Sequence, residues 1–263
     1  MDITIIVPIL LGWAGGLFIN YIADVLPQTR TLSQPTCPNC QYSFSWGNYL
    51  TLRTCRSCGQ KRSLRTWVVQ ILTLASFLYL WLSPSKALGI PLGMIVLLYF
   101  GIVTVIDLEH RLILHSTSIA GAVIALIAGV SLNSRINNNG LFLGAGMSLL
   151  GGVFGFGVMF LFYQLGALVS RYRARKLQSA GQADDEEEAL GGGDVFLLGV
   201  LGLMLGWPII WDTLLLGILL GGFVSLIFVI LLIMRRKYSS EALMTFIPYG
   251  PYFIAGAFFK LFF

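Results

Sequence analysis

Hydrophobic residues along this chain form long continuous runs instead of the alternating patterns typical of a soluble domain. Each of eight runs is close to the roughly 20 residues with which a helix crosses a hydrocarbon layer of about 30 Å. They cover residues 3–23, 66–83, 87–106, 112–132, 141–162, 195–211, 213–234 and 245–263. The sixth run is the least regular, because Gly206 and Pro208 interrupt it. The pattern predicts an all-α, polytopic membrane protein with about eight transmembrane helices.

Composition and charge extend this picture to orientation. Hydrophobic residues make up 56% of the 263 residues and charged residues only 11%, too few to cover the surface of a soluble domain. Successive loops between crossings lie on opposite sides of the membrane. Fourteen of the 17 Lys and Arg residues fall on one side, whereas Lys86, Arg135 and Lys260 lie on the other. The positive-inside rule then places the basic loops in the cytoplasm and both termini outside. Because the basic residues are spread over four loops without a basic, aromatic-rich stripe, we expect no nucleic-acid partner.

Two long connections divide the chain into segments. Residues 1–23 form the first predicted transmembrane helix, 24–65 a cytoplasmic loop, and 66–263 the remaining helices. The second long connection, 171–193, reads "RYRARKLQSAGQADDEEEALGGG". A basic cluster, an acidic run and glycines cannot bury a core, so this segment is predicted to be a flexible cytoplasmic linker.

All four cysteines lie in the first cytoplasmic loop, in a C-x2-C-x14-C-x2-C pattern: Cys37, Cys40, Cys55 and Cys58. This spacing is typical of a four-cysteine zinc site, in which four thiolates leave no open position for catalysis. A loop of this size has too small a core to fold unaided, and a metal ion would supply the missing stability. The sequence therefore predicts a small module stabilised by structural zinc; a redox dithiol pair and incidental thiols are the alternatives.

Two aspartates are candidates for chemistry. Asp194 follows three glycines and opens the sixth hydrophobic run, where a carboxylate could simply cap the helix. Asp107 ends the third run, where the helix dipole opposes a negative charge, so local helix energetics do not explain it. Both positions are predicted at the cytoplasmic face. Two carboxyl groups brought together can share one proton and provide an acid and a base for peptide hydrolysis. Gly191 and Gly193 would let an extended substrate backbone approach Asp194.

The other polar residues near the helix ends have simpler interpretations. Asp24, at the end of the first run, could contact the cysteine loop. Glu109 and Arg111 flank His110 in a short segment that is expected to be a solvated surface turn. The acidic run at 184–188 is expected to be solvated, with attraction of a basic substrate tail as the alternative.

Several motifs together resemble a known family. Gly191, Gly193 and Asp194 form a GxGD motif, and Asp107, the cysteine loop, "GLFINYIADVLP" at 16–27 and "FIPYGPYFIAGA" at 246–257 accompany it. In this combination the chain resembles the bacterial type IV prepilin peptidases (prepilin leader peptidase/N-methyltransferases), which are GxGD-type intramembrane aspartyl proteases. The resemblance extends over nearly the whole chain.

The resemblance implies a metal-independent aspartic endopeptidase of the bacterial inner membrane, with Asp107 and Asp194 as catalytic residues. Its substrate would be a prepilin or pseudopilin of a pilus or type II secretion system, whose short basic leader is cut at the cytoplasmic face. Many members then methylate the new N-terminus with S-adenosylmethionine, for which the sequence identifies no binding residues. It also leaves open the particular substrate and the oligomeric state.

This chain departs from the family pattern at three positions. Phe196 stands where a Lys is common, Val25 where an Arg is usual, and Gln70 near the position of a usual Glu. Two of these positions flank the cysteine loop, so we predict efficient leader removal with weak or absent N-methylation.

Two other classes of function fit the same residues. A proton- or cation-coupled transporter or channel could use the two aspartates, although both lie at one face and no paired broken helices mark a transport path. A non-catalytic assembly factor stabilised by zinc is the third class. Leader cleavage of a prepilin distinguishes the peptidase from both.

Overall fold

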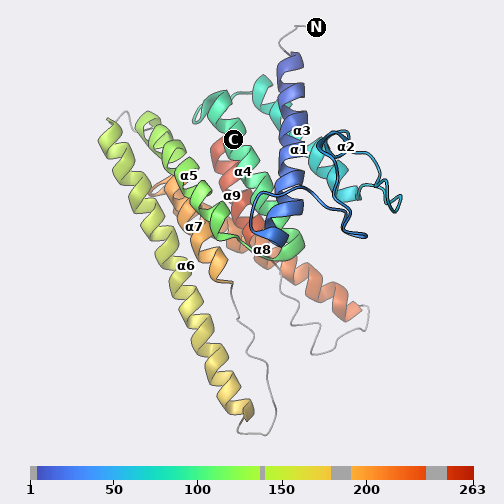
Figure 1. The fold of residues 1–263 in the computed structure, drawn as a ribbon. Coiled ribbons are helices and arrows are strands. Elements are labelled where there is room, and N and C mark those ends of the chain that lie inside the picture. Colours follow the sequence, from blue (N-terminus) through green and yellow to red (C-terminus); the bar gives the residue numbers. More distant parts are fainter. Residues whose placement is uncertain (1–4, 137–139, 179–190, 235–247) are drawn as a thin grey trace. The chain divides into compact units, whose positions relative to one another are not determined.

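The computed structural model describes residues 5–136, 140–178, 191–234 and 248–263 (Figure 1). Within these ranges the structure is helical, and its β pairing is confined to one isolated bridge between Thr36 and Ser43. The helices are α1 (Ile6–Thr29), α2 (Trp46–Leu50), α3 (Leu64–Leu82), α4 (Gly89–His110), α5 (His115–Ile136), α6 (Leu141–Gln178), α7 (Gly192–Leu205), α8 (Ile209–Met234) and α9 (Gly250–Phe262). The predicted all-α fold is confirmed.

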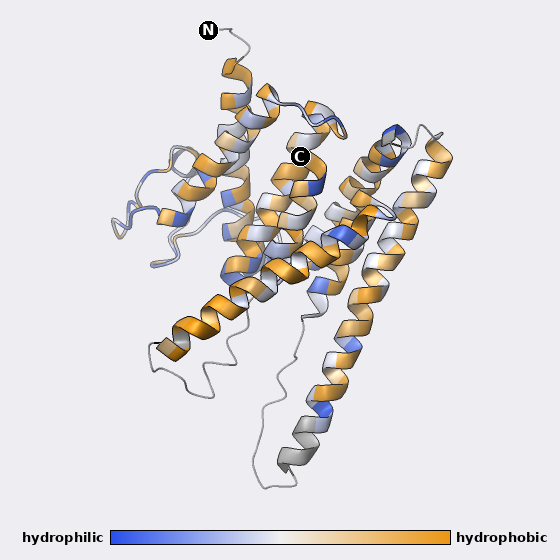
Figure 2. Cartoon of the chain, turned by 180° about the vertical axis from the view of Figure 1, so that it is seen from behind, coloured by the Kyte–Doolittle hydropathy of each residue, from blue (hydrophilic) through white to orange (hydrophobic). Residues whose placement is uncertain are grey.

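Six helices are long and apolar enough to cross a membrane: α1, α3, α4, α5, α6 and α8. Apolar residues dominate most of the length of these helices (Figure 2). The apolar helix α7 has only 14 residues and α9 has 13. The chain is therefore a multi-pass membrane protein, whereas the predicted count of eight crossings is not confirmed.

The sixth predicted run breaks where its sequence indicated. Helix α7 ends at Leu205, and Gly206 follows with a positive φ of 74°, which favours glycine. Pro208 lacks a backbone N–H and precedes the first residue of α8, Ile209. Glycine and proline therefore divide residues 195–211 between two helices.

The chain forms two compact units, residues 1–111 and 112–263. This division falls at a different point from the segment boundaries predicted from the sequence. In the first unit, α1 packs along α3, and α4 packs against both. Gly12 and Gly16 lie on the α1 face that meets α3: a Cβ at Gly12 would lie 2.9 Å from the Leu74 Cα. The close contact needs residues without side chains at this crossing.

In the second unit, α7 packs against α5, α6 and α9, and α8 packs against α6 and α9. The side chains of Leu197, Leu198 and Leu201 on α7 are fully buried. Gly151 and Gly155 of α6 face α7, where a Cβ on either would overlap the α7 backbone. Glycine thus lets α6 approach the helix that begins beside Asp194.

Helix α6 is longer than its hydrophobic run predicted. It has 38 residues, which corresponds to about 57 Å at 1.5 Å per residue. Its last eight residues, 171–178, fall in the predicted linker, which is therefore helical in this part. Arg, Lys, Leu, Ala and Gln are good helix formers, so the helix can continue beyond the apolar segment. The next predicted linker residues, 179–190, lie outside the described residues.

Replacing Gly155 by Val is expected to destabilise the second unit by about 1–3 kcal/mol, because the new side chain would overlap the Leu198 carbonyl group on α7. Gly157→Val is the matched control on the same helix, since no atom lies within 4 Å of a Cβ there. Thermal unfolding in detergent measures the difference. Equal melting temperatures for the two variants would contradict the close α6–α7 contact.

Candidate functional site

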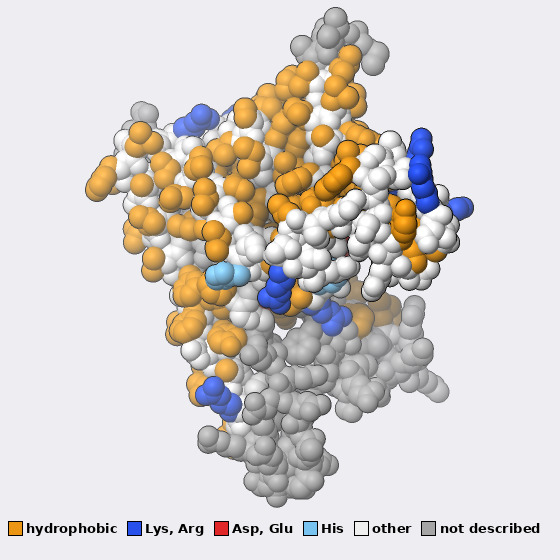
Figure 3. Space-filling view, in the orientation of Figure 1, with side chains coloured by type: hydrophobic (Ala, Val, Ile, Leu, Met, Phe, Trp, Pro, Cys, Tyr) orange, Lys and Arg blue, Asp and Glu red, His pale blue; other side chains and the backbone are white. Residues whose placement is uncertain are grey.

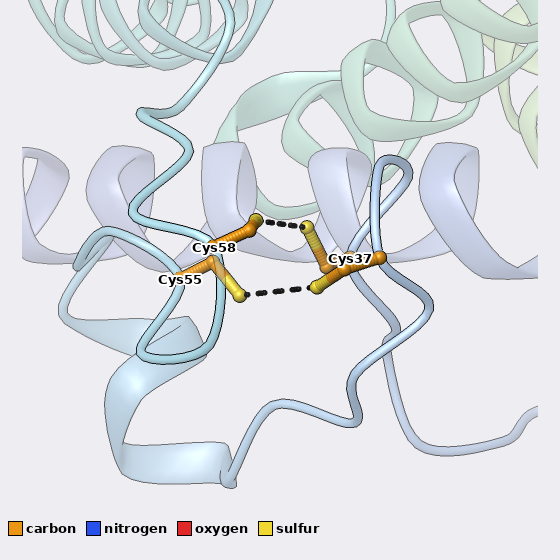
Figure 4. Close-up of side chains that lie close together, drawn as sticks. Cys37, Cys55 and Cys58 are labelled. Atoms are coloured by element: carbon orange, nitrogen blue, oxygen red, sulfur yellow. Dashed lines mark hydrogen bonds between the residues drawn. The ribbon is translucent and has the colours of Figure 1, made fainter.

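The structure brings the four cysteines of the loop together. The Sγ atoms of Cys37 and Cys58 are 3.7 Å apart, and those of Cys40 and Cys55 are 3.6 Å apart (Figure 4). All four sulfur atoms lie within 4.8 Å of one another. In a tetrahedral site with metal–sulfur bonds of about 2.3 Å, the sulfur atoms lie about 3.8 Å apart. The predicted ligand set can therefore hold one metal ion.

Two turns of the same geometry present the sulfur atoms. In each turn the N–H of the first cysteine donates to the carbonyl five residues later, and its own carbonyl accepts from the N–H four residues later. The residue after the second cysteine is left-handed in both turns: Gln41 with φ of 56° and Gly59 with φ of 69°. The N–H groups of Cys58 and, more weakly, Ser57 lower the pKa of the Cys55 thiol to about 6, although burial raises it. A thiol that ionises readily suits a metal ligand.

A small aromatic core supports the cysteine turns. Cys37, Cys55, Phe44 and Tyr49 are buried together, and Tyr21 of α1 packs against them. The Arg62 guanidinium stacks on this core, 4.4 Å from the ring centres of Phe44 and of Tyr49. The loop therefore forms a compact module against α1.

Charged groups at the helix ends join this module to the helices. The Tyr49 hydroxyl donates to Asp24 Oδ2 at 2.6 Å, which confirms the expected contact between Asp24 and the loop. Asp24 Oδ1 pairs with the Arg65 guanidinium, and Arg65 also donates to Glu109 Oε2 at 2.9 Å. Glu109 is exposed, as expected of a surface position, but it belongs to the last turn of α4 and its carboxylate pairs with Arg65.

Sequence reasoning missed the roles of Arg65 and Tyr49. Arg65 lies in the first turn of α3, where the helix dipole opposes a positive charge. This unfavourable position was a signal that a tertiary partner compensates the charge. Tyr49 gave no comparable signal, because an aromatic residue in a small loop is explained by packing alone.

Asp107 lies in the last turn of α4, in the first unit. Asp107 is buried, with only 4% of its surface exposed. The helix ends at His110, and Arg111 adopts a left-handed conformation with φ of 52° while its N–H donates to the Asp107 carbonyl at 2.9 Å. A buried carboxyl group at a helix C-terminus is energetically costly, as the sequence indicated.

Asp194 lies in the first turn of α7, in the second unit. Its backbone N–H donates to the Gly191 carbonyl at 3.1 Å, and Gly191 is the extended residue before the helix. Gly193 packs closely against Ile113, in the connection that leads into α5: a Cβ at residue 193 would lie 2.8 Å from Ile113 Cβ. This contact explains why residue 193 is glycine without any substrate. The roles of Gly191 and Gly193 in substrate approach stay predictions.

Of the three positions that depart from the family pattern, two are buried, whereas Phe196 is 45% exposed. Val25 is buried in α1. Gln70 is 1% exposed on α3, and its Nε2 donates to the Trp13 carbonyl of α1 at 2.6 Å. Phe196 packs its ring against His115 of α5 and Phe156 of α6, with ring centres 5.6 Å and 5.9 Å apart. Gln70 therefore acts as a polar tie between two helices.

Comparison with known proteins matches both halves of the chain. Residues 92–226 match the Type IV leader peptidase family, and residues 10–83 match the Bacterial Peptidase A24 N-terminal domain. The first match contains Asp107 and Asp194, and the second contains all four cysteines. No solved structure matches the chain.

Three curated relatives carry the name prepilin leader peptidase/N-methyltransferase. The protein of Myxococcus xanthus is 26% identical over 82% of this chain and 61% of its own length. That of Pectobacterium carotovorum is 29% identical over 86% of this chain and 73% of its own. The relative from Pseudomonas aeruginosa is 28% identical over 94% and 87% respectively. The chain thus spans less than two thirds of the Myxococcus protein.

These matches agree with the sequence motifs and with the helical architecture. One family description covers the segment with the two aspartates, and a companion domain covers the cysteine module. The chain therefore belongs to the type IV leader peptidase family, and the prediction of a prepilin peptidase is confirmed at the level of the family.

Proposed function

We propose that this protein removes the basic leader of a type IV prepilin or pseudopilin, using Asp107 and Asp194 as its catalytic pair. The observation that carries the proposal is the family match over residues 92–226, which contains both aspartates. Two features of the surroundings support it. Asp107 is buried at a helix end that disfavours a negative charge, and Asp194 follows the GxG turn at the start of α7.

The reaction needs one carboxyl group protonated and the other ionised, as in other aspartic proteases. The ionised group takes a proton from water while the water oxygen attacks the scissile carbonyl carbon. The protonated group donates its proton to the carbonyl oxygen. The aspartate that took the water proton then donates it to the leaving nitrogen, and the C–N bond breaks. A hydroxyl of the tetrahedral diol returns its proton to the other aspartate as the new carbonyl forms, so the pair ends with one proton and is ready for another cycle.

The proposed location is the inner membrane of a bacterium, with both termini outside and the catalytic pair at the cytoplasmic face. The positive-inside rule supports this orientation. Several Lys and Arg side chains lie on the surface of the cysteine module (Figure 3), and Arg53, Arg56 and Lys61 are exposed there. The leader of a prepilin would meet the enzyme on this side, and its apolar segment would lie in the membrane.

The proposed metal is structural zinc, held by Cys37, Cys40, Cys55 and Cys58. Four sulfur ligands in tetrahedral spacing suit zinc, and a reducing cytosol disfavours structural disulfides. When bound, zinc would join the two cysteine turns and stabilise the module. Zinc would take no part in hydrolysis, since four thiolates leave no position for water.

Incubating the purified, detergent-solubilised protein with a prepilin tests the proposed reaction. The expected product is mature pilin shortened by the leader, which mass spectrometry identifies. An intact prepilin, together with proton flux in liposomes that depends on Asp107 and Asp194, would instead favour a transporter.

N-methylation is expected to be weak or absent when the same assay contains S-adenosylmethionine. Gln70 carries no charge to hold a protonated amine, and its side chain is buried against α1. The measurement is the mass of the new N-terminus, in which each methyl group adds about 14 Da. Already trimmed pilin serves as a second substrate, so that slow cleavage cannot imitate weak methylation. A fully methylated product would show that another group binds the amine.

A further inference from the structure

Arg65 connects three parts of the first unit. Its guanidinium binds Asp24 near the end of α1 and Glu109 in the last turn of α4, while Arg65 itself belongs to α3. The Tyr49 hydroxyl extends the set of contacts from Asp24 into the cysteine module. We call the set of Tyr49, Asp24, Arg65 and Glu109 the Arg65 network.

Local helix energetics oppose the two charges that are closest to helix ends. The positive Arg65 is the second residue of α3, near the positive end of that helix dipole. The negative Glu109 is the second-last residue of α4, near the negative end. Either charge alone is unfavourable, and the ion pair offsets both. Residues that break a local rule and compensate one another in the fold indicate a selected tertiary contact.

Within the module, a hydrogen bond and a cation–π contact hold the Tyr49 side chain in place. Burial raises the pKa of Tyr49 strongly, and the nearby Asp24 charge raises it further, so the hydroxyl keeps its proton and donates a hydrogen bond to Asp24. Arg62 stacks on the Tyr49 ring and fixes its plane. The exposed side of the network is Glu109, whose side chain is 37% accessible.

Glu109 precedes the last residue of α4 and follows Asp107 by two positions, in the same helical turn. Holding Glu109 therefore fixes the end of the helix on which Asp107 lies. We propose that Arg65 is a positioning residue, which ties the last turn of α4 to the cysteine module through Glu109 and Asp24 and so orients Asp107. This inference rests on the proposed catalytic role of Asp107. The cysteine module would then contribute to proteolysis by helping to orient Asp107, without contacting the scissile bond.

The test is steady-state cleavage of a prepilin by the full-length variant Glu109→Gln. Loss of the ion pair loosens the α4 end, and kcat is expected to fall roughly tenfold, because small displacements of a catalytic group are costly in rate. KM is expected to stay constant, since Glu109 does not bind substrate in this proposal. Arg65→Lys keeps the charge but loses the planar fork that holds two carboxylates, so its kcat should lie between those of the wild type and Arg65→Gln.

Asp212→Asn is the matched control, because it removes the exposed Asp212–Lys260 ion pair, of 2.8 Å, from the second unit. Its kcat should equal that of the wild type. All variants are expected to keep their metal content and nearly the melting temperature of the wild type. Unchanged kcat in Glu109→Gln, or a loss that only follows the amount of folded protein, would overturn the positioning role. Full activity of Asp107→Asn would instead overturn the proposed catalytic pair, so the two failures are distinguishable.

Discussion

Replacing Asp107 or Asp194 by Asn is expected to abolish leader cleavage, with kcat reduced about 10²–10⁴-fold or more. An amide has nearly the shape of a carboxyl group but can neither release a proton to the leaving group nor take one from water. The loss is therefore chemical, and KM should change little. The measurement is single-turnover cleavage of a prepilin with enzyme in excess, which separates the chemical step from product release.

The control for both variants is Asp212→Asn, since Asp212 lies exposed at the start of α8 and pairs with Lys260. It should cleave like the wild type, and all three variants should have similar circular dichroism and elution volumes. Turnover close to the wild-type rate in Asp107→Asn or Asp194→Asn would remove that residue from the mechanism. A chelator added to the reaction should not slow the chemical step, because the proposed mechanism uses no metal.

Much of the fold is predictable because the bilayer limits it so strongly. A hydrophobic run of about 20 residues has few stable structures other than a helix, since lipid satisfies no backbone polar groups. Gly206 and Pro208 likewise marked the end of α7 in the sequence. Helix length beyond the apolar run was not predictable in the same way. The polar end of α6 depends on helix propensity, which is a weak signal beside hydrophobicity.

In the candidate site, contacts set by local spacing were predictable, whereas contacts between distant residues were not. The spacing of the four cysteines is enough to predict that they cluster, because two short turns bring the four sulfur atoms together regardless of the rest of the fold. The pairing of Glu109 with Arg65 joins residues 44 positions apart, and no spacing rule relates them. Gly193 shows that a motif residue can also have a packing reason: a Cβ there would lie 2.8 Å from Ile113 Cβ, while its predicted role in substrate approach stays a prediction. Close packing alone can therefore require glycine at a motif position.

Freshly purified protein is expected to contain about one zinc ion per chain, and Cys37→Ser or Cys58→Ser to lose nearly all of it. Removing one of four thiolates breaks a closed tetrahedral site, whose metal affinity supplies much of the stability of so small a module. Ser57→Ala is the matched control within the second turn, since its side chain is exposed and is not a ligand in this proposal. Elemental analysis of unchelated protein gives the metal content. Metal-free wild-type protein, or full zinc content in both cysteine variants, would contradict the site.

Loss of zinc should also expose the module to trypsin, because Arg53, which precedes the second cysteine turn, and Arg56, which lies within it, would then belong to an unfolded loop. Limited proteolysis of Cys37→Ser is expected to cut this loop at least about tenfold faster than in Ser57→Ala. Leader cleavage should fall only in part, since the module touches the helices through Tyr49 and Asp24 and supplies no catalytic group. Trypsin resistance in a zinc-free variant would show that the aromatic core of the module is stable without metal.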